Sequence, residues 1–312
     1  MKTTDQIAVI GAGLAGLTVA RALSDAGHNV VVFDKGRGLG GRMASRRRDG
    51  WRFDHGAIAL RPTDQAFAEF ITQIEAEGFA AHWPDAGGWI GLPGMSGSVK
   101  SMAQSLTVHN EAEVTGLDRS GDTWTLHGVE HAQGVGFDRL ILAIPQPQAL
   151  RLLSPWPDVQ AKIAPATVTP CWTLMAGFDA PLATKLTYAN DMTGPIAVIA
   201  RVTAKPDRDL PGDGGVIQAG EAWSRAHLER ERKEVALLLL DAFFAAIDCP
   251  PVAPVISMAH RWRHALTEKP LGHACLNDPT LGLSICGDWC LGPTAQDAFN
   301  SGRSLATALL SE

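Results

Sequence analysis

The first forty residues alternate between apolar runs and glycines in a way that predicts a strand, a tight turn, a helix and a second strand. The uninterrupted apolar run 7–10 is typical of a strand buried on both faces of a parallel sheet. Apolar residues recur at helical spacing over 14–26, and Gly27 ends that pattern. A β-branched run over 29–33 then ends at Asp34. Together these segments predict one βαβ unit.

The next part of the chain predicts shorter elements. Phenylalanine and isoleucine fall on one side of a helix predicted over 64–77, with Thr63 as its N-cap. Proline, glycine and tryptophan over 83–97 predict a loop, and a short helix is expected over 98–106. Alternating residues over 113–142 predict a β-meander whose first turn is Arg119-Ser120-Gly121-Asp122 and whose last strand starts at Arg139.

Beyond a cluster of prolines at 145–157 the pattern changes character. A short strand is expected at 196–202, and a long amphipathic helix at 224–247. The mixed charges of 229–234 predict a solvated face of that helix, with Glu229/Lys233 and Arg230/Glu234 four residues apart. The chain then returns to a strand at 283–286 and a final helix that runs to Leu310.

Composition excludes several classes of protein. The 312 residues suggest about two domains, and 46% hydrophobic with 19% charged residues is ordinary globular composition. A net charge of −6 argues against a nucleic-acid partner or a polybasic membrane surface. Five cysteines without CxxC spacing predict no metal site and a reducing compartment. The glycines within 7–23 argue against a signal peptide, and the apolar run 235–247 is too short to cross a bilayer, so we expect a soluble cytoplasmic protein with no membrane partner.

The turn after the first strand carries the spacing Gly11-x-Gly13-x-x-Gly16. Gly11 permits a sharp turn, Gly13 lets the backbone approach a pyrophosphate, and Gly16 lets the helix pack closely on the strand. The start of the helix offers free N–H groups to phosphates. Asp34 ends the second strand, where a carboxylate can accept hydrogen bonds from ribose hydroxyls. These residues predict a dinucleotide site.

A second glycine-rich loop, Gly38-Leu39-Gly40-Gly41-Arg42-Met43, follows the acid directly. A domain that binds only NAD does not need it, whereas the pyrophosphate and ribityl chain of FAD need a second backbone surface and a cation. Arg42 is the expected cation, and Arg46, Arg47 and Arg48 are interpreted as solubilising charge. Asp54-His55-Gly56-Ala57 is an acid-x-Gly-Ala turn that can bring backbone near the isoalloxazine ring.

A third signal lies near the end of the chain. Gly287 follows a predicted buried strand and would let the backbone close on the ribityl chain, and Asp288 would accept from a ribityl hydroxyl. The helix that begins near Thr294 has a Thr-x-x-Asp sequence close to a capping box. Its dipole would point at the flavin pyrimidine.

These blocks together resemble the bacterial renalases of the FAD-dependent amine-oxidase-like superfamily. The resemblance extends over nearly the whole chain and rests on the blocks Ile10 to Gly16, Phe33-Asp34-Lys35, Gly40-Gly41-Arg42-Met43, Gly94-Met95-Ser96, Ala143 to Ala149, Trp223-Ser224-Arg225, His260-Arg261-Trp262 and Cys286-Gly287-Asp288-Trp289-Cys290. It implies a flavoprotein with non-covalent FAD that oxidises dihydropyridine isomers of NAD(P)H to NAD(P)⁺, with dioxygen reduced to hydrogen peroxide.

The resemblance also implies an α/β fold with two domains. A discontinuous Rossmann-like FAD-binding domain of the glutathione-reductase/amine-oxidase type would take 1–60, 94–150 and 270–312, and a mixed-sheet substrate domain 61–93 and 151–269. The expected cofactor-binding residues are Gly11, Gly13, Leu14, Ala15, Gly16, Asp34, Lys35, Gly40, Gly41, Arg42, Met43, Gly56, Ala57, Val114, Ala143, Gly287, Asp288, Gln296 and Ala298.

Hydride transfer to flavin N5 needs placement and a dry pocket rather than a protein acid or base, so no catalytic residue is nominated. The candidate substrate-pocket residues are Trp223, Trp262, Trp289, His55 and Ile58, since aromatic rings can wall a flat or cationic substrate, and His260 is interpreted as structural. The family pattern leads us to expect Gly-Ala-Gln-aromatic, whereas this chain has Gly56-Ala57-Ile58-Ala59, and Arg263-His264 replaces an expected aromatic. The 80–94 loop is also shorter than expected. These departures fall at positions expected to contact the substrate.

Several alternatives stay open from the sequence. Within flavin chemistry they are the oxidation of another amine and carotenoid-type desaturation. Outside it they are an FAD-binding sensor or scaffold without turnover, which the altered Ile58-Ala59 positions favour, and an NAD-only dehydrogenase. The expected partners are a small-molecule substrate and dioxygen, and the expected state is a monomer or weak dimer.

Overall fold

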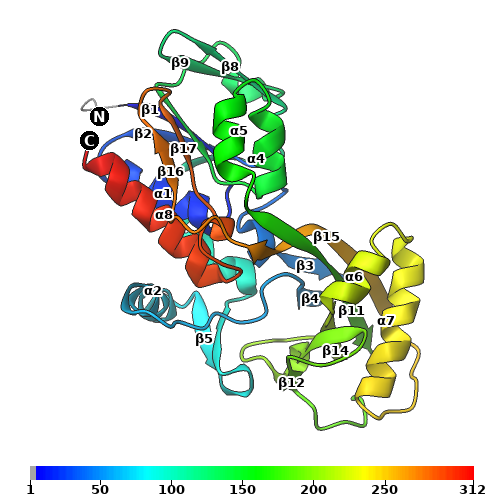
Figure 1. Cartoon of the computed structure of the whole chain (residues 1–312). Helices are drawn as coiled ribbons and strands as arrows, with labels where there is room; N and C mark the ends of the chain where they lie inside the picture. The colour runs from blue at the N-terminus through cyan, green and yellow to red at the C-terminus, as the bar shows by residue number, and fades with distance from the viewer. Residues whose placement is uncertain (1–4) are drawn as a thin grey trace. The chain divides into compact units, whose positions relative to one another are not determined.

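A computed structural model describes residues 5–312 of the chain, which form two compact units (Figure 1). Unit 1 consists of the chain up to Arg42, of Val99–Val168 and of Thr267–Glu312, and unit 2 of Met43–Ser98 and Thr169–Leu266. The bounds differ from the expected domains: 43–60 and 94–98 fall in unit 2, and 151–168 and 267–269 in unit 1. Strand β4 (Trp51–Asp54) contacts strand β14 (Asp213–Ala219) of unit 2, and Leu153, Val159 and Ile163 are buried in the core of unit 1.

Unit 1 is built on a six-stranded sheet with the order β16-β17-β10-β1-β2-β7. The strands are β1 (Gln6–Ile10), β2 (Asn29–Phe33), β7 (Thr107–His109), β10 (Arg139–Leu142), β16 (Leu276–Asp278) and β17 (Leu283–Ile285). All neighbours pair in parallel except the edge strand β16, which is antiparallel to β17. The βαβ unit predicted from the first forty residues is therefore confirmed, with α1 over Leu14–Asp25.

The expected β-meander is correct in its first half and wrong in its second. β8 (Gly116–Ser120) and β9 (Thr123–His127) form the hairpin, and Gly121 occupies its turn at φ +58°. β10 leaves that hairpin and lies in the parallel sheet between β1 and β17. Its apolar residues Leu140, Ile141 and Leu142 are fully buried, which suits a central parallel strand rather than a half-exposed meander strand.

The helices of unit 1 are α1, α3 (Lys100–Ala103), α4 (Gln146–Leu152), α5 (Pro157–Ile163) and α8 (Ala295–Leu310), with short 3₁₀ turns at Glu130–Ala132 and Asp288–Cys290. A further 3₁₀ turn, Gly41–Met43, lies at the boundary where unit 1 passes into unit 2. α3 is shorter than the helix expected over 98–106. α1 and α8 cross so closely that a Cβ on Gly302 would lie 2.4 Å from the Ala15 carbonyl oxygen. This contact fixes the C-terminal helix beside the helix of the first glycine turn (Figure 1).

Unit 2 is built on an antiparallel sheet with the order β12-β13-β14-β11-β15. The strands are β11 (Thr167–Phe178), β12 (Tyr188–Ala189), β13 (Ile196–Arg201), β14 (Asp213–Ala219) and β15 (Ile256–Lys269). The apolar face of α7 (Arg232–Ala246), including Val235, Leu239 and Phe243, packs into the core of this sheet. Two hairpins complete the unit, β3 (Ser45–Arg48) with β4 (Trp51–Asp54) and β5 (Ala80–Trp83) with β6 (Gly88–Gly91).

Two helices of unit 2 differ from the expected ones. α2 covers Gln65–Ala76, and its N-cap is Asp64 rather than Thr63, since the Asp64 side chain accepts a hydrogen bond from the Phe67 amide. The long helix expected over 224–247 is two helices, α6 (Glu221–Ala226) and α7. The break includes Glu229, whose carboxylate binds Arg263 instead of Lys233. The expected Arg230–Glu234 pair is present.

The segment expected to be a loop over 83–97 is also more ordered than predicted. It contains a 3₁₀ turn at Pro84–Ala86, the strand β6, and a second 3₁₀ turn at Met95–Val99. The glycines in this strand are required by packing: a Cβ on Gly88 would lie 2.6 Å from the Leu60 carbonyl oxygen. Glycine here therefore marks close backbone approach rather than a turn. No helix within 5–312 has both the length and the apolar character that crossing a membrane requires.

Candidate active site

The first glycine turn is closed on one side and open on the other. Gly11 has φ +111°, and a Cβ there would lie 2.4 Å from the Ala143 carbonyl oxygen. A Cβ on Gly16 would lie 2.0 Å from the Gly11 carbonyl oxygen. A Cβ on Gly13, in contrast, would meet nothing within 4 Å. Gly13 is also the N-cap of α1, with no side-chain cap and no acidic residue in the first turn, so the amides of this helix start can receive a phosphate.

The second glycine loop lies directly on the first, as a shared cofactor requires. The Gly40 amide donates to the Ala12 carbonyl at 2.8 Å, and Gly13 and Gly40 form a bridge. Gly41 has φ +54°, and a Cβ on it would lie 3.5 Å from the Gly13 Cα. Side chains at these positions would fill the space that the two loops share. This cradle of bare backbone fits the diphosphate of a dinucleotide.

Asp34 closes the end of the first turn. One carboxylate oxygen accepts from the Ala12 amide at 2.6 Å and the other from the Gly36 amide at 2.6 Å. Each oxygen keeps a further lone pair for a ribose hydroxyl, so the predicted role fits the geometry. The neighbouring Lys35 lies 3.8 Å from Glu113 in an exposed ion pair.

Arg42 and Asp288, each predicted separately to contact FAD, contact one another in unit 1. Arg42 donates to both carboxylate oxygens of Asp288, one of them at 2.8 Å. The Thr267 hydroxyl lies 3.1 Å from the same carboxylate. The preceding Gly287 amide donates to the Ser301 hydroxyl at 2.9 Å, which ties the turn to α8. The Asp288 side chain is 5% exposed and that of Arg42 30% exposed, so the cation is the accessible member of the pair.

The remaining predicted cofactor residues divide between the two units. In unit 1, Leu14, Ala15 and Val114 are buried, while Gln296 and Ala298 are half-buried in the first turns of α8. The capping box of α8 is confirmed, since Thr294 and Asp297 bond reciprocally. Met43, Gly56 and Ala57 belong to unit 2, where the Gln218 amide donates to the Gly56 carbonyl at 2.6 Å.

Three rings of unit 2 form a cluster: His55, which directly follows β4, and His260 and Trp262 of β15. The ring centroids of His55 and His260 are 4.8 Å apart, those of His55 and Trp262 5.1 Å, and those of His260 and Trp262 4.4 Å. The Trp262 indole donates to the His55 carbonyl at 2.8 Å. His260, expected to be structural, is thus a half-buried member of the same cluster as two predicted pocket residues.

Both imidazoles of this ring cluster are uncharged at neutral pH. Burial and then the charge of Arg46 lower the pKa of His55 from 6.5 to about 4. Burial, His55, Arg46 and Arg232 lower the pKa of His260 to about 3. A group with so low a pKa is a poor general base for a substrate that is protonated at neutral pH.

A buried charge cluster that the sequence did not reveal surrounds Asp54. This carboxylate accepts from Lys205 Nζ at 2.8 Å, from Arg208 at 2.8 Å, from the Ser45 hydroxyl at 2.6 Å and from the Met95 amide at 2.8 Å. Burial by itself would raise the pKa of Asp54, but Lys205 and Arg208 outweigh burial and hold it well below its usual range. The sequence motif at 54–57 includes Asp54, whereas no local sequence pattern predicted that Lys205 and Arg208 would bind it.

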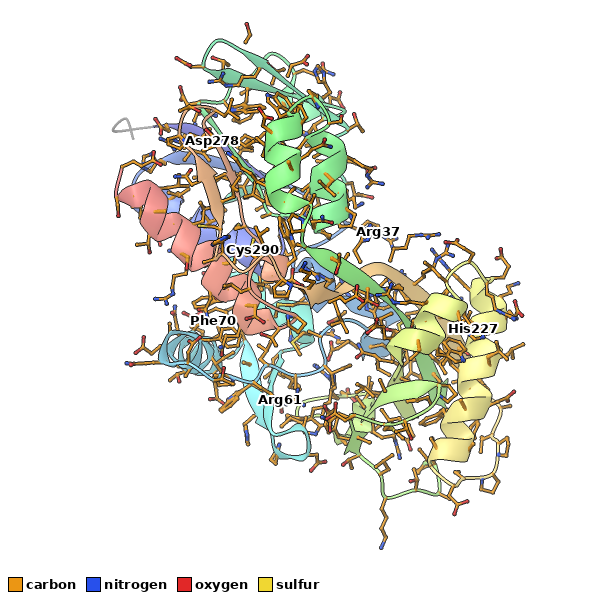
Figure 2. All side chains as sticks on the ribbon, viewed as in Figure 1. Arg37, Arg61, Phe70, His227, Asp278 and Cys290 are labelled. Carbon is orange, nitrogen blue, oxygen red and sulfur yellow. The ribbon has the colours of Figure 1, made fainter. Side chains whose placement is uncertain are left out.

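Two of the predicted tryptophans have structural partners. Trp223 stacks on His227, four residues later, with ring centroids 3.9 Å apart. His227 is labelled in Figure 2. Trp289 is 1% exposed, and its indole donates to the Ile144 carbonyl at 3.0 Å. We therefore assign Trp289 to the core of unit 1 rather than to a pocket wall. Ile58 is 7% exposed in unit 2.

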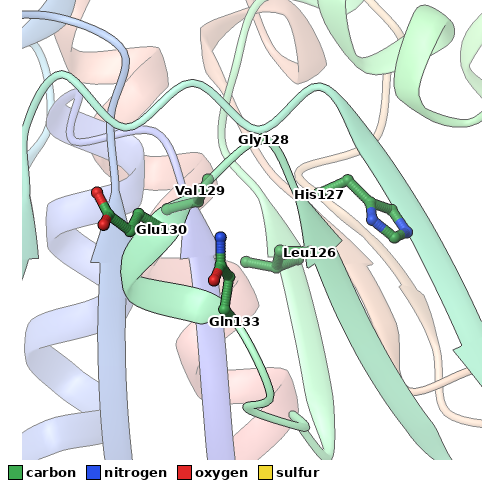
Figure 3. A pocket seen from close by; sticks show the side chains of 6 residues that line it. All are labelled: Leu126, His127, Gly128, Val129, Glu130 and Gln133. Atoms are coloured by element: carbon green, nitrogen blue, oxygen red, sulfur yellow. The ribbon is translucent and has the colours of Figure 1, made fainter.

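A separate surface hollow in unit 1 contains none of these residues. Figure 3 shows it beside β9, lined by Leu126, His127, Gly128, Val129, Glu130 and Gln133. No cluster of three or more metal-ligating side chains occurs in the part of the chain that the structure describes. The candidate chemistry therefore rests on the two glycine loops, the Arg42–Asp288 pair and the ring cluster.

Two family models match this chain. The model of an NAD(P)-binding Rossmann-like domain matches residues 9–74, and that of flavin containing amine oxidoreductase matches residues 84–310. A 58-residue segment is 47% identical to a 4,4'-diapophytoene desaturase of Staphylococcus aureus (strain MRSA252), covering 18% of this chain and 12% of that protein. A 75-residue segment is 38% identical to an L-amino-acid oxidase of Siganus canaliculatus, covering 23% and 14%. The matches thus span a small part of these relatives.

Solved structures resemble the whole chain in fold. A putative protoporphyrinogen oxidase from Exiguobacterium sp. 255-15 superposes with a TM-score of 0.70 at 15% identity, covering 100% of both chains. A putrescine oxidase bound to putrescine superposes with a TM-score of 0.68 at 14% identity, covering 99% of both. With most of its length matched by the second family model, the chain belongs to the flavin containing amine oxidoreductases, and its cofactor is FAD.

Proposed function

We propose that this protein is a renalase-like oxidase that takes a hydride from dihydropyridine nucleotides, the isomeric forms of NAD(P)H. Bound FAD would supply a two-electron acceptor for this hydride, leaving the substrate ring as a pyridinium, and dioxygen would take up the two electrons with the transferred hydrogen and one solvent proton to give hydrogen peroxide. The protein's own part is to hold FAD, to stack the substrate ring and to exclude water.

The residues of unit 1 support the cofactor half of this proposal. We infer that the amides at the start of α1, with Gly13 and Gly41, hold the diphosphate, and that Arg42 offsets its charge. Asp34 would accept from the ribose hydroxyls beside its two amide donors. Gly287 and Asp288 would face the ribityl chain from the turn that Ser301 holds.

The charge of the ring cluster in unit 2 is the observation that favours a dihydropyridine nucleotide. Alkylamines are ammonium ions at neutral pH and must lose a proton before a hydride can leave. His55 and His260, with pKa values of about 4 and about 3, are poorly suited to take that proton. A dihydropyridine ring carries no such proton. Its nucleotide phosphate would be attracted by Arg46, whose charge lowers the pKa of both imidazoles, and by Arg232, whose charge lowers the pKa of His260.

Oxidation of another amine is the second candidate, and the fold shared with putrescine oxidase favours it. The electrostatics of the ring cluster point the other way, because the positive charges near His260 would repel an ammonium ion. The third possibility is a protein that holds FAD without turnover, which the altered Ile58-Ala59 positions would accommodate.

Steady-state oxygen consumption tests the proposal. The FAD-loaded protein is supplied in turn with dihydropyridine isomers of NADH, with NADH itself, with putrescine and with buffer alone. We expect oxygen uptake, hydrogen peroxide and NAD⁺ in equal amounts with the isomers and no uptake with putrescine. Turnover of putrescine alone would establish the amine oxidase instead. No uptake with any donor would establish the FAD-binding protein without turnover.

A further inference from the structure

We propose that Arg46 is the specificity-determining residue that binds the phosphate group of the nucleotide substrate. This inference rests on the proposed function and extends it, since it names the part of the substrate that the protein recognises outside the reacting ring. Arg46 was interpreted from the sequence as solubilising charge, together with Arg47 and Arg48. The structure separates it from both neighbours.

The hairpin register places Arg46 on the side of the ring cluster. Arg46 lies opposite Phe53 in the antiparallel pair of β3 and β4. Side chains on a hairpin alternate between its two faces, and directly opposite residues share a face. Arg46 therefore lies on the same face as Phe53, and His55, two residues after Phe53, continues that face. Arg47 points to the opposite face and is exposed.

The surroundings of Arg46 leave its charge without a counterion. Its side chain is half-buried, and it forms no ion pair or side-chain hydrogen bond with any residue of 5–312. Arg48, in contrast, contacts Asp49 and Met258. The carboxylate next to the cluster, Asp54, is already shared by Lys205 and Arg208. A partly desolvated guanidinium without an anion is costly and gains strongly when an anion binds.

The chemistry of guanidinium selects the ligand. The planar guanidinium can donate two parallel hydrogen bonds to two oxygens of a phosphate. In a partly buried site this paired contact binds a phosphate more strongly than the single ammonium group of a lysine does. A dihydropyridine nucleotide held beside the half-buried His260 and Trp262 would carry its phosphate on the ribose, one sugar away from the reacting ring. Arg232, exposed at the start of α7, adds a second positive charge on the same side, as its effect on His260 indicates.

Kinetics with paired substrates test this assignment. The pair is a dihydronicotinamide mononucleotide isomer, which has the phosphate, and the matching riboside, which lacks it. For Arg46→Gln we expect KM for the mononucleotide to rise about tenfold or more, as for loss of a charge-assisted hydrogen bond, while kcat and the KM for the riboside stay unchanged. Arg46→Lys should recover part of the loss. Arg47→Gln, one residue away and exposed, is the matched control and should match the parent protein with both substrates.

Two further readouts do not depend on turnover. Nicotinamide mononucleotide, the oxidised form, should perturb the visible spectrum of the parent flavoprotein at lower concentration than nicotinamide riboside, and Arg46→Gln should remove that difference. Inorganic phosphate should compete with the mononucleotide in the parent protein and not in Arg46→Gln. FAD content and melting temperature of the variants establish that they are folded.

The possible outcomes separate this inference from the proposed function. Equal KM effects of Arg46→Gln on mononucleotide and riboside would overturn the phosphate assignment and leave the oxidase proposal standing. An unchanged KM for the mononucleotide would do the same. If the parent protein oxidises neither substrate, the proposed function fails. The phosphate site is then tested by the spectral titration alone, in which Arg46→Gln should lose the preference for mononucleotide over riboside.

Discussion

Arg42 and Asp288, 246 residues apart in the chain, form an ion pair in which the guanidinium donates to both carboxylate oxygens. The sequence predicted both as FAD contacts with separate roles. The pair changes that interpretation, because a carboxylate that holds the fork of Arg42 fixes the direction in which its remaining N–H groups point. We therefore propose that Asp288 positions Arg42 for the diphosphate of FAD, in addition to the ribityl contact proposed for it.

The first prediction concerns retention of FAD. Asp288→Ala should weaken FAD binding by about 1–2 kcal/mol, because it removes a hydrogen-bond acceptor and releases Arg42. Fluorescence titration of the apoprotein with FAD measures the change. Asp158→Asn, an exposed residue of α5 in the same unit, is the control and should bind FAD normally. Unchanged affinity in Asp288→Ala would contradict the placement of this turn at the cofactor.

Gly13 and Gly16 give a matched pair of variants with opposite expected results. Gly13→Ala adds a methyl group where nothing lies within 4 Å, so the apoprotein should keep its stability while FAD affinity falls. Gly16→Ala places that group 2.0 Å from the Gly11 carbonyl oxygen, so the apoprotein itself should lose stability. Urea unfolding of both apoproteins, followed by FAD titration, separates the two effects. Normal FAD binding by Gly13→Ala would show that the open side of this turn does not face the diphosphate.

The sequence predicted most of unit 1 because its signals are local. The parallel strand 7–10, the glycine turn and the Thr294 capping box each depend on residues a few positions apart, and all three are present. The prediction over 113–142 was wrong because its last strand is paired by distant residues. A strand that follows a hairpin can pair either with that hairpin or with a strand far away in the sequence. β10 pairs with β1 and β17, and only its burial on both faces distinguishes the two cases.

The site of unit 2 was predicted less completely for the same reason. Nothing near Lys205 or Arg208 in sequence indicates that both reach Asp54, about 150 residues earlier, and the contact exists because a loop between β13 and β14 folds over the end of β4. The helix expected over 224–247 was wrong, because turn residues at 227–230 separate α6 from α7, and Glu229 within that turn pairs with Arg261 and Arg263. The pattern of hydrophobic residues does not predict ion pairs between charged residues that are far apart in the sequence.

The acid sensitivity of the fold should reflect the ring cluster. In the folded state the pKa of His55 is about 4 and that of His260 about 3, against 6.5 when unfolded. The unfolded chain therefore binds more protons below pH 6.5, and the free energy of unfolding should fall as the pH drops from 6.5 towards 4. His55→Gln should lose less stability over this range than the parent protein in urea unfolding. Equal slopes for parent and His55→Gln would contradict a neutral buried imidazole.

The buried cluster around Asp54 should be essential to unit 2. Asp54→Asn leaves Lys205 and Arg208 buried without their counterion and should cost about 3–5 kcal/mol in the free energy of unfolding. Asp118→Asn removes an exposed pair with His127 and should cost less than about 1 kcal/mol. Chemical denaturation at neutral pH compares them. A cost for Asp54→Asn as small as that of the exposed pair would mean that water reaches the cluster.

The central claim is that a dihydropyridine nucleotide delivers its hydride to the flavin of this protein. Anaerobic stopped-flow measurement of the flavin's visible absorbance tests it most directly, because it isolates reduction from the reaction with oxygen. We predict that an equimolar amount of a dihydropyridine isomer of NADH bleaches the oxidised flavin and leaves NAD⁺, and that deuterium at the donor carbon slows the bleaching. Flavin that stays oxidised with every isomer, while an amine such as putrescine bleaches it, would contradict the account.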